Sequence, residues 1–224
     1  IFIRSRGLHY QVRPMNTDDI AQAVRLEREA FPSQWPTTSF RHELQNKLAR
    51  YLVVCDGLRN ESQTAPIAAP VPEERAARPG RLVSRIKNLF GRGMDFIDTD
   101  SPGVVQPILG MVGYWLMFDE AHITTIAVWE HLRRQGLGEL LLASTFDMAM
   151  EQHAKVVTLE VRVSNTAAQA LYEKYGFMNV GTRRAYYTDN KEDAFIMTTV
   201  ELTSEPFLSQ YRHLKHLCME RLEG

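Results

Sequence analysis

The residues best suited to chemistry lie in the second half of the chain, where an apolar run meets a helical pattern. Two glycines, Gly136 and Gly138, open that helical pattern, and backbone N–H groups at such glycines can approach a ligand closely. Arg133 and Arg134 add positive charge beside them. The pattern predicts a phosphate or pyrophosphate site, although a glycine pair alone is also typical of an ordinary helix entry. The cofactor candidates are Ile126, Ala127, Val128, Arg133, Arg134, Gln135, Gly136, Leu137 and Gly138.

A carboxylate stands in the middle of another apolar run, residues 156–163. In a strand, Glu160 would point to one face together with Thr158 and Arg162, while the apolar residues point to the other. An acid in mid-strand is unusual enough to indicate a site, and a carboxylate of moderately raised pKa can accept a proton. The alternative is a Glu160–Arg162 pair on a solvated face, and spacing alone does not decide between the two.

Composition narrows the class of protein. Of the 224 residues, 44% are hydrophobic and 24% are charged, which excludes global disorder. Lys and Arg number 26 against 27 Asp and Glu, which argues against a basic coat for nucleic acid. The longest apolar run, 108–118, is about half the length of a membrane-spanning helix. We expect a cytoplasmic protein with no transmembrane segment and no sequence-specific nucleic-acid binding.

Cysteine and histidine usage adds two negative expectations. The two cysteines, Cys55 and Cys218, cannot form a disulfide framework, and their apolar surroundings argue against an acyl-cysteine route. The seven histidines are scattered, so we expect no metal site and assign no histidine a catalytic role.

Alternating and helical patterns predict an α/β protein with at least one parallel strand pair. Strands are expected at 9–15, 51–55, 107–118, 121–128, 156–163, 178–187 and 194–202. Helices are expected from Asn16–Thr17 to Pro32 and over 37–46, 136–152, 165–175 and 203–224, the last being amphipathic.

The stretch between the two halves has a different texture. Residues 58–107 contain six of the ten prolines, so 58–106 is expected to be a largely flexible insertion. Within it, residues 75–92 carry six basic residues and no acidic ones. This segment could dock weakly on an anionic surface, such as RNA or lipid; the plainer interpretation is a solvated linker helix.

Several linked motifs, taken together, resemble one family. The pattern Arg-x-x-Gly-x-Gly after a strand and before a helix resembles the acetyl-CoA pyrophosphate loop of the GNAT acetyltransferases. Further segments resemble the RimI-type branch, the ribosomal-protein-alanine N-acetyltransferases. These segments are FPSQWPTTSFRHEL (31–44), HITTIAV (122–128), RRQGLG (133–138), LEVRVSN (159–165), ALYEKYGF (170–177), RRAYY (183–187) and EDAFIM (192–197).

The resemblance covers roughly 8–57 and 107–202, which defines an expected acetyltransferase domain over 8–202, interrupted by 58–106. It implies the GNAT fold: a mixed, mostly antiparallel central sheet with a splayed parallel pair, flanked by helices. The insertion and the helix over 203–224 depart from the compact family pattern.

The resemblance also implies site roles. The loop ending at Gly138 would hold the pyrophosphate of acetyl-CoA, and the backbone of 126–128 would pair with its pantetheine amides as an added strand does. Asn165 would hydrogen-bond the cofactor, although it also fits a simple helix N-cap. The backbone N–H near Val128 would polarise the thioester carbonyl.

The resemblance also implies catalytic and substrate roles for five positions. Glu160 would be the base for the amine and Tyr172 the acid for the leaving thiolate, although spacing alone would make Tyr172 a core residue. Trp35, Tyr186 and Tyr187 would flank the peptide channel, with the plainer alternative that the two adjacent tyrosines occupy opposite faces of a strand.

The expected activity is direct acetyl transfer from acetyl-CoA to the α-amine of a protein. The resemblance points to the N-terminal alanine of a small-subunit ribosomal protein. The alternatives are acetylation of another amine, such as a lysine side chain, a polyamine or an antibiotic, and a noncatalytic acetyl-CoA-binding docking module.

Overall fold

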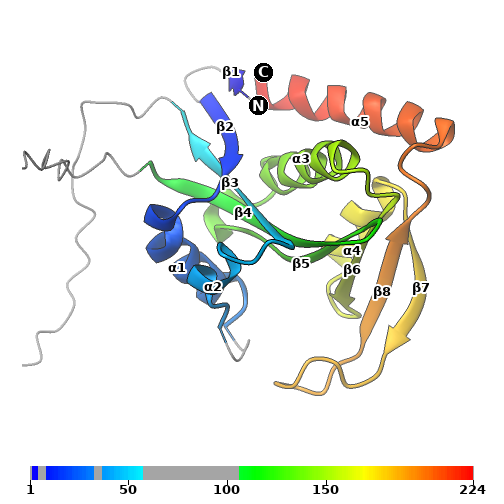
Figure 1. The fold of residues 1–224 in the computed structure, drawn as a ribbon, viewed down its shortest axis with the longest axis horizontal. Coiled ribbons are helices and arrows are strands. Elements are labelled where there is room, and N and C mark those ends of the chain that lie inside the picture. The colour runs from blue at the N-terminus through cyan, green and yellow to red at the C-terminus, as the bar shows by residue number, and fades with distance from the viewer. Residues whose placement is uncertain (1, 5–8, 33–36, 58–105, 224) are drawn as a thin grey trace, which may run out of the picture. The chain divides into compact units, whose positions relative to one another are not determined.

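The computed structural model describes residues 2–4, 9–32, 37–57 and 106–223 (Figure 1). Three of the sequence-based expectations therefore lie outside the described residues. They are the substrate contact by Trp35, the docking segment 75–92, and the flexibility of the insertion 58–106, of which only Gln106 is described.

A single sheet of eight strands forms the framework, in the order β1-β2-β3-β4-β5-β6-β8-β7. Neighbouring strands are antiparallel except β5 and β6, which run parallel, so the expected mixed sheet is confirmed. The strands are β1 (Phe2–Arg4), β2 (His9–Pro14), β3 (Ala49–Asp56), β4 (Ile108–Met117), β5 (Glu120–Val128), β6 (Val156–Arg162), β7 (Phe177–Arg183) and β8 (Ala194–Thr199).

Five α-helices and two short 3-10 turns complete the described chain. Asn16 begins the first helical segment with a capping box to Asp19, as a polar residue at a helix start favours. The helical elements are η1 (Thr17–Asp19), α1 (Ile20–Ala30), α2 (Phe40–Glu43), η2 (Glu130–Leu132), α3 (Leu137–Glu151), α4 (Thr166–Lys174) and α5 (Glu205–Glu223).

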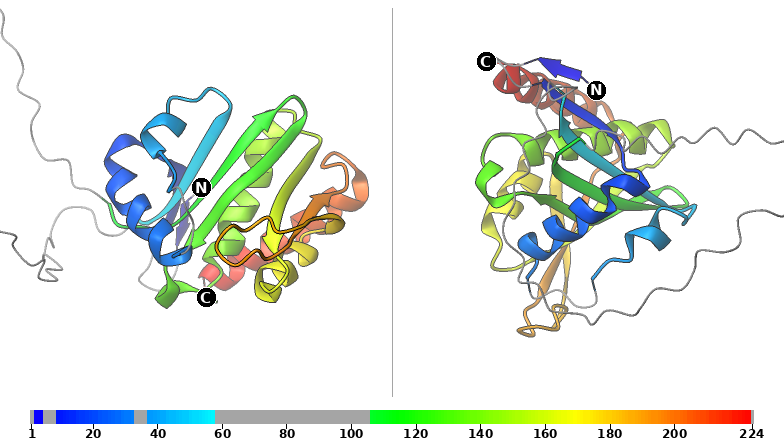
Figure 2. Two further views of the ribbon diagram at one scale, coloured as in Figure 1. Left: turned by 90° about the horizontal axis from the view of Figure 1, so that it is seen from below. Right: turned by 90° about the vertical axis from the view of Figure 1, so that its left-hand side faces the viewer.

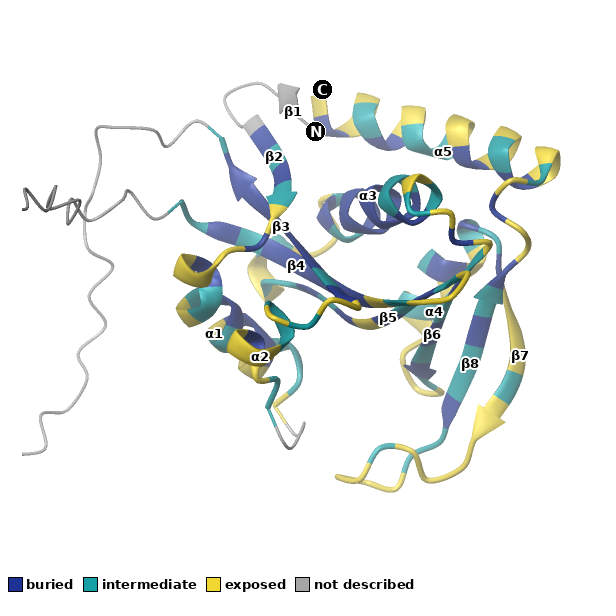
Figure 3. Ribbon diagram, viewed as in Figure 1, coloured by how far each residue is buried: buried dark blue, intermediate teal, exposed yellow. Residues whose placement is uncertain are grey.

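Helices cover both faces of the sheet, and each face has its own apolar core (Figures 1 and 2). On one face, α1 and α2 pack over β3 and β4 through residues such as Leu26 and Phe40. On the other face, α3 lies against the sheet and α5 lies over α3. Because α3 is enclosed from two sides, it is buried almost all round (Figure 3), including Leu142 and Phe146.

Most expected elements are confirmed, but three differ from the sequence prediction. The helix predicted over 37–46 spans only Phe40–Glu43, and β1 was not foreseen. The strand predicted over 178–187 ends at Arg183, so Tyr186 and Tyr187 lie in the β7–β8 loop rather than on two faces of a strand. Period-two patterns cannot separate a strand end from an aromatic loop, because both carry the same residue types.

Candidate active site

The parallel strands β5 and β6 separate partway along their length. They pair from Glu120 opposite Val156 to Ile123 opposite Leu159, although β5 continues to Val128. A register shift in the β4–β5 pair, next to Gly113, coincides with this point. Beyond it, the described structure pairs β5 with β4 on one edge only, so the backbone of residues 126–128 offers hydrogen-bonding groups on its other edge.

The loop after β5 leads into α3 with features of an anion site. Gly136 has φ +89°, a left-handed conformation that glycine adopts without strain. The start of α3 has no side-chain cap, so the first-turn N–H groups remain available to a ligand. A β-carbon on Gly138 would make ordinary van der Waals contact with Leu171, at 3.9 Å, and would meet nothing closer.

Charge around this loop is also favourable. Arg133 and Arg134 are exposed beside the helix start, as is Gln135. The Arg133 Nε lies 3.4 Å from the carbonyl oxygen of Val128, which ties the loop to the end of β5. The glycine turn, the uncapped helix start and the two arginines fit the pyrophosphate of a nucleotide cofactor.

Glu160 on β6 is nearly buried, with 6% of its side chain exposed, and it faces two basic groups from two other strands of the sheet. Its Oε2 lies 3.0 Å from His122 Nε2 on β5, and its Oε1 lies 2.9 Å from Arg183 Nε on β7. Glu160 makes no pair with Arg162 in the described structure, so the surface-pair alternative is wrong.

The pKa of Glu160 differs from the expectation in direction. Burial alone would raise the pKa of this carboxyl, but the hydrogen bond from His122 and the charges of His122 and Arg183 together lower it. The moderately raised pKa expected from sequence is therefore wrong. Glu160 is therefore ionised at neutral pH, and it can accept a proton effectively only together with its hydrogen-bonded partners.

His122 is the partner that sequence reasoning missed. Its Nδ1 lies 2.9 Å from Thr158 Oγ1, and that hydroxyl donates its own hydrogen to Glu120 at 2.5 Å. With that hydroxyl donating to Glu120, the Thr158 oxygen is placed to accept from Nδ1–H while Nε2 faces Glu160, an arrangement that suits the doubly protonated ring. The hydrogen bond with Glu160 raises the pKa of His122, against the opposing effect of burial.

Tyr172 on α4 is buried, with 5% of the residue exposed, and its ring centroid lies 5.6 Å from that of Phe177. Burial raises its pKa well above the ordinary value, and the nearby Tyr187 phenol adds to this. Tyr172 is thus packed in the core and remains a protonated phenol. Asn165, at the start of the same helix, accepts the Ala168 N–H at 3.2 Å, which is the N-cap role.

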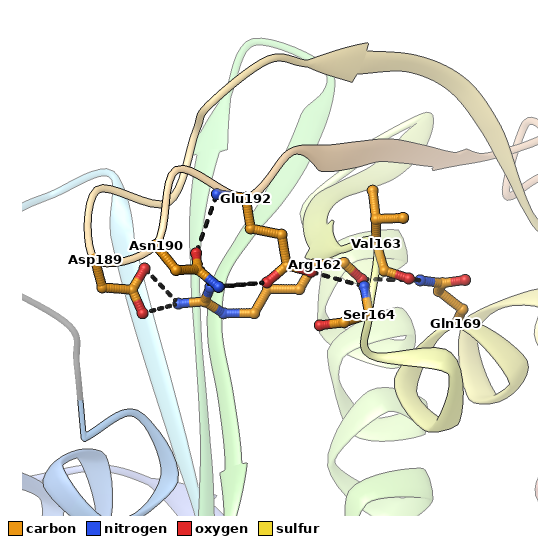
Figure 4. Close-up of polar contacts among 7 residues, drawn as sticks. All are labelled: Arg162, Val163, Ser164, Gln169, Asp189, Asn190 and Glu192. Atoms are coloured by element: carbon orange, nitrogen blue, oxygen red, sulfur yellow. Dashed lines mark hydrogen bonds and ion pairs between the residues drawn. The ribbon is translucent and has the colours of Figure 1, made fainter.

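The C-terminal end of β6 is joined to the β7–β8 loop through Arg162 (Figure 4). The Arg162 Nη2 lies 2.9 Å from Asp189 Oδ2, and Nη1 lies 3.1 Å from both Asn190 Oδ1 and Glu192 Oε2. Glu192 also accepts the Ser164 N–H at 2.7 Å, and hydrogen bonds from Ser164 lower the pKa of Glu192 to about 2. One guanidinium thus holds three residues of this loop.

The same guanidinium supports the loop tyrosines. Its central carbon lies 3.8 Å from the ring centroid of Tyr187, and Tyr186 packs edge-on against Tyr187. Burial raises the pKa of Tyr187 to about 12. Arg183, which contacts Glu160, also lies near the Tyr186 ring, with its guanidinium carbon 5.6 Å from the ring centroid. The structure therefore brings Glu160, Tyr172, Tyr186 and Tyr187 into one region.

The two cysteines lie away from this chemistry. Both are free and buried, Cys55 in β3 and Cys218 in α5, as expected. Burial raises the pKa of each thiol to about 11, so neither is a ready nucleophile. The described residues contain no group of three or more His, Cys, Asp or Glu arranged to hold a metal ion. Over the same residues, no helix has the length and apolar character needed to cross a membrane.

Comparison with known proteins agrees with this geometry. The model of the Acetyltransferase (GNAT) family matches residues 86–177. A putative [ribosomal protein bS18]-alanine N-acetyltransferase of Bacillus subtilis is 34% identical over 187 residues, covering 83% of this chain and 92% of that protein. An N-alpha-acetyltransferase of Sulfurisphaera tokodaii is 30% identical, covering 86% and 93%.

Solved structures show the same relationship. The crystal structure of the ribosomal-protein-S18-alanine N-acetyltransferase from Escherichia coli has a TM-score of 0.58 and 25% identity, covering 88% of this chain and 97% of that one. The open sheet with its parted parallel strands is the GNAT acyltransferase fold. The chain belongs to the GNAT family of acetyltransferases, enzymes that use acetyl-CoA as the acetyl donor.

Proposed function

We propose that this enzyme acetylates the α-amine at the N-terminus of a protein. The observation that carries the proposal is the nearly buried Glu160–His122 pair, set where β5 and β6 separate and beside the tyrosines of the β7–β8 loop. The names of the Bacillus subtilis and Sulfurisphaera tokodaii relatives, both N-acetyltransferases, support the same class of acceptor.

The more specific proposal is that the acceptor is the N-terminal alanine of a small-subunit ribosomal protein. The support is the name of the Bacillus subtilis relative, which specifies alanine of ribosomal protein bS18 and aligns over most of this chain. An enzyme with this substrate would work in the cytoplasm, where ribosomal proteins are made.

Residues on two elements are suited to hold acetyl-CoA. The first-turn N–H groups of α3 and the side chains of Arg133 and Arg134 would bind the pyrophosphate. The free backbone edge of 126–128 would pair with the pantetheine amides. Asn165 already caps α4 through its side-chain oxygen, which leaves its NH₂ group to donate to the cofactor. When bound, acetyl-CoA supplies an acetyl group activated as a thioester.

The acceptor amine has to lose its protons as its nitrogen bonds to the acetyl carbon. A peptide α-amine has a pKa of about 7.7–8.0, so an appreciable neutral fraction exists at neutral pH. Glu160 is ionised and would orient the amine and draw its proton. Because its lowered pKa makes it a weak proton acceptor alone, we assign proton uptake to the Glu160–His122 pair, with His122 in its neutral form.

Tyr172 would return a proton to the sulfur as the carbon–sulfur bond breaks. Its phenol is protonated across the physiological range because burial raises its pKa. Burial disfavours the phenolate form of Tyr172, so this residue would regain its proton promptly after each turnover.

The β7–β8 loop would receive the peptide. Tyr186 is 43% exposed, and its ring packs edge-on against Tyr187, which Arg162 supports. These rings would cover a small first residue and leave the following backbone room to pass. Trp35 lies outside the described residues, and its part in the peptide channel rests on its motif alone. Asp193 accepts the Ala185 N–H at 2.7 Å, so its carboxylate helps to hold the loop.

The test is thiol release from acetyl-CoA with an acceptor panel. The panel contains short peptides that differ only in residue one, with free lysine and spermidine beside them. We expect turnover to be fastest on the alanine-starting peptide and to be lost in both Glu160→Gln and Tyr172→Phe. Turnover only on lysine or spermidine would overturn the α-amine proposal. Acetyl-CoA binding without turnover on any acceptor would overturn catalysis itself.

A further inference from the structure

The last helix, α5, lies outside residues 86–177, where the family model matches, and it runs along α3 (Figure 1). Its buried residues lie on one face: Phe207, Tyr211, Cys218 and Leu222. Near the middle of α3, the Tyr211 hydroxyl hydrogen-bonds the Ala143 carbonyl oxygen at 2.9 Å. The helix is therefore fixed along its length, and the position of its last turn is defined by α3.

That last turn reaches the glycine turn before α3. Leu222 is 4% exposed, and its Cδ2 lies 3.1 Å from the place where a β-carbon on Gly136 would stand. The leucine therefore occupies the space left by the missing side chain. Glycine has more backbone conformational freedom than a residue with a side chain. A close-packed neighbour therefore restricts the backbone more at Gly136 than it would at another residue type.

A charged network lies beside this contact. Glu139, in the first turn of α3, has 6% of its side chain exposed, and its Oε2 lies 2.8 Å from Arg221 Nη1 on α5. Its Oε1 accepts a hydrogen bond from the Tyr175 hydroxyl at 2.9 Å and from Lys174 at the end of α4. The start of α3, the end of α4 and the last turn of α5 thus meet at one carboxylate.

We propose that the last turn of α5, through Leu222 and Arg221, is a positioning element for the cofactor loop. It holds the Gly136–Gly138 turn in the conformation that presents its N–H groups to the pyrophosphate. Because the turn is already ordered, it loses little conformational entropy when the cofactor binds. Neither residue touches the cofactor; both act from behind the loop. This inference rests on the proposed function, in the part that assigns the pyrophosphate to this loop.

The chain offers a matched control for the test. Lys215 also joins α5 to α3, through Asp147 Oδ2 at 2.6 Å, but it does so two turns away from the loop. Arg221→Met and Lys215→Met each remove one ion pair between the same two helices. A role limited to holding α5 in place would give the two variants the same behaviour.

The experiment measures CoA affinity by titration calorimetry, together with the KM for acetyl-CoA and kcat. We expect Leu222→Ala to weaken CoA binding about tenfold, as loss of a residue that supports a ligand-binding group does. Arg221→Met should weaken it about threefold, the size expected for a half-exposed ion pair. Lys215→Met should bind as wild type. In the first two variants, KM rises and kcat at saturating acetyl-CoA stays unchanged.

Two results would overturn the inference. The variant Gly138→Asp distinguishes a failure of the role given to α5 from a failure of the loop assignment. If Leu222→Ala and Arg221→Met lower the unfolding temperature as Lys215→Met does but bind CoA as wild type, α5 is only a packing element. Gly138→Asp puts a carboxylate where it suits the helix dipole but repels a pyrophosphate. If Gly138→Asp also binds CoA as wild type, the loop assignment fails, and the inference fails with it.

Discussion

Glu139 and Glu160 have the same side-chain exposure, similar basic partners and the same direction of pKa shift, but they lie in different parts of the fold. Each has 6% of its side chain exposed, each contacts two basic side chains, and each has a lowered pKa despite burial that opposes this. Glu139 lies among three helices, with Lys174 and Arg221 as partners. Glu160 lies where two strands separate.

The decisive difference is the kind of cation. Arg221 keeps its charge across the physiological range, so Glu139 lies in a permanently charged network with this arginine and with Lys174. Glu160 is paired with a histidine, which can change its charge near neutral pH. Burial and pKa direction therefore do not separate a structural carboxylate from a chemical one; the titration behaviour of its partner does.

Replacing each carboxylate in turn with a neutral amide tests most strongly whether the two residues have different roles. Glu160→Gln should lower kcat on the order of 10³-fold, because the proton-accepting pair is lost. Glu139→Gln should keep kcat at saturating acetyl-CoA near wild type but lower the free energy of unfolding by about 2 kcal/mol. Steady-state kinetics and urea denaturation measure both. Equal losses of kcat in the two variants would contradict the distinction.

The pH profile tests the histidine half of the argument. The pair accepts a proton only when His122 is neutral, and its pKa is raised above about 6.5, so kcat/KM should rise with pH through a midpoint above that value. In His122→Asn the rising limb should disappear, and the rate at neutral pH should fall on the order of 10²-fold. A limb that persists unchanged in the variant would assign it to the substrate amine.

The β7–β8 loop gives a smaller effect. Arg162→Lys keeps the charge but loses the planar fork that holds Asp189 and Glu192. We expect the KM for an alanine-starting peptide to rise about tenfold, since one charge-assisted hydrogen bond is worth about 1.5 kcal/mol. The KM for acetyl-CoA should stay at the wild-type value. Arg184→Lys, at an exposed position in the same loop, is the control, and an equal effect there would contradict a specific role for Arg162.

The smallest expected effect concerns Thr158. Thr158→Val removes the acceptor for His122 Nδ1–H, so the protonated ring loses one stabilising contact. The midpoint of the pH profile should shift down by about 0.7 unit, since one hydrogen bond is worth about 1 kcal/mol and one pKa unit about 1.4 kcal/mol. An upward shift, measured by the same rate profile, would reverse the protonation assigned to the ring.

Sequence reasoning recovered the elements because their periodicity is strong. The alternation in β6 placed Thr158, Glu160 and Arg162 on one face, and the structure has the same pattern. The helix start after Gly136 and the cap at Asn165 can be predicted from the sequence equally well. In each case the signal is local, because it lies within a few residues of the chain.

What sequence could not supply is which strands face one another. His122 lies opposite Thr158 in the parallel register, next to Glu160, but 38 positions separate His122 from Glu160 in the chain. Arg183 reaches the same carboxylate from a strand that is not adjacent to β6 in the sheet. The direction of the Glu160 pKa shift depends on these two contacts, so it could not be predicted from β6 alone.

The central claim is that the acceptor is an α-amine, and one peptide can test it directly. A peptide that starts with alanine and contains an internal lysine offers both amines to the enzyme at equal concentration. Tandem mass spectrometry of the product after incubation with acetyl-CoA then locates the acetyl group. The account predicts acetylation of the alanine nitrogen with the lysine unmodified. Acetyl on the lysine Nζ, with a free N-terminus, would contradict it.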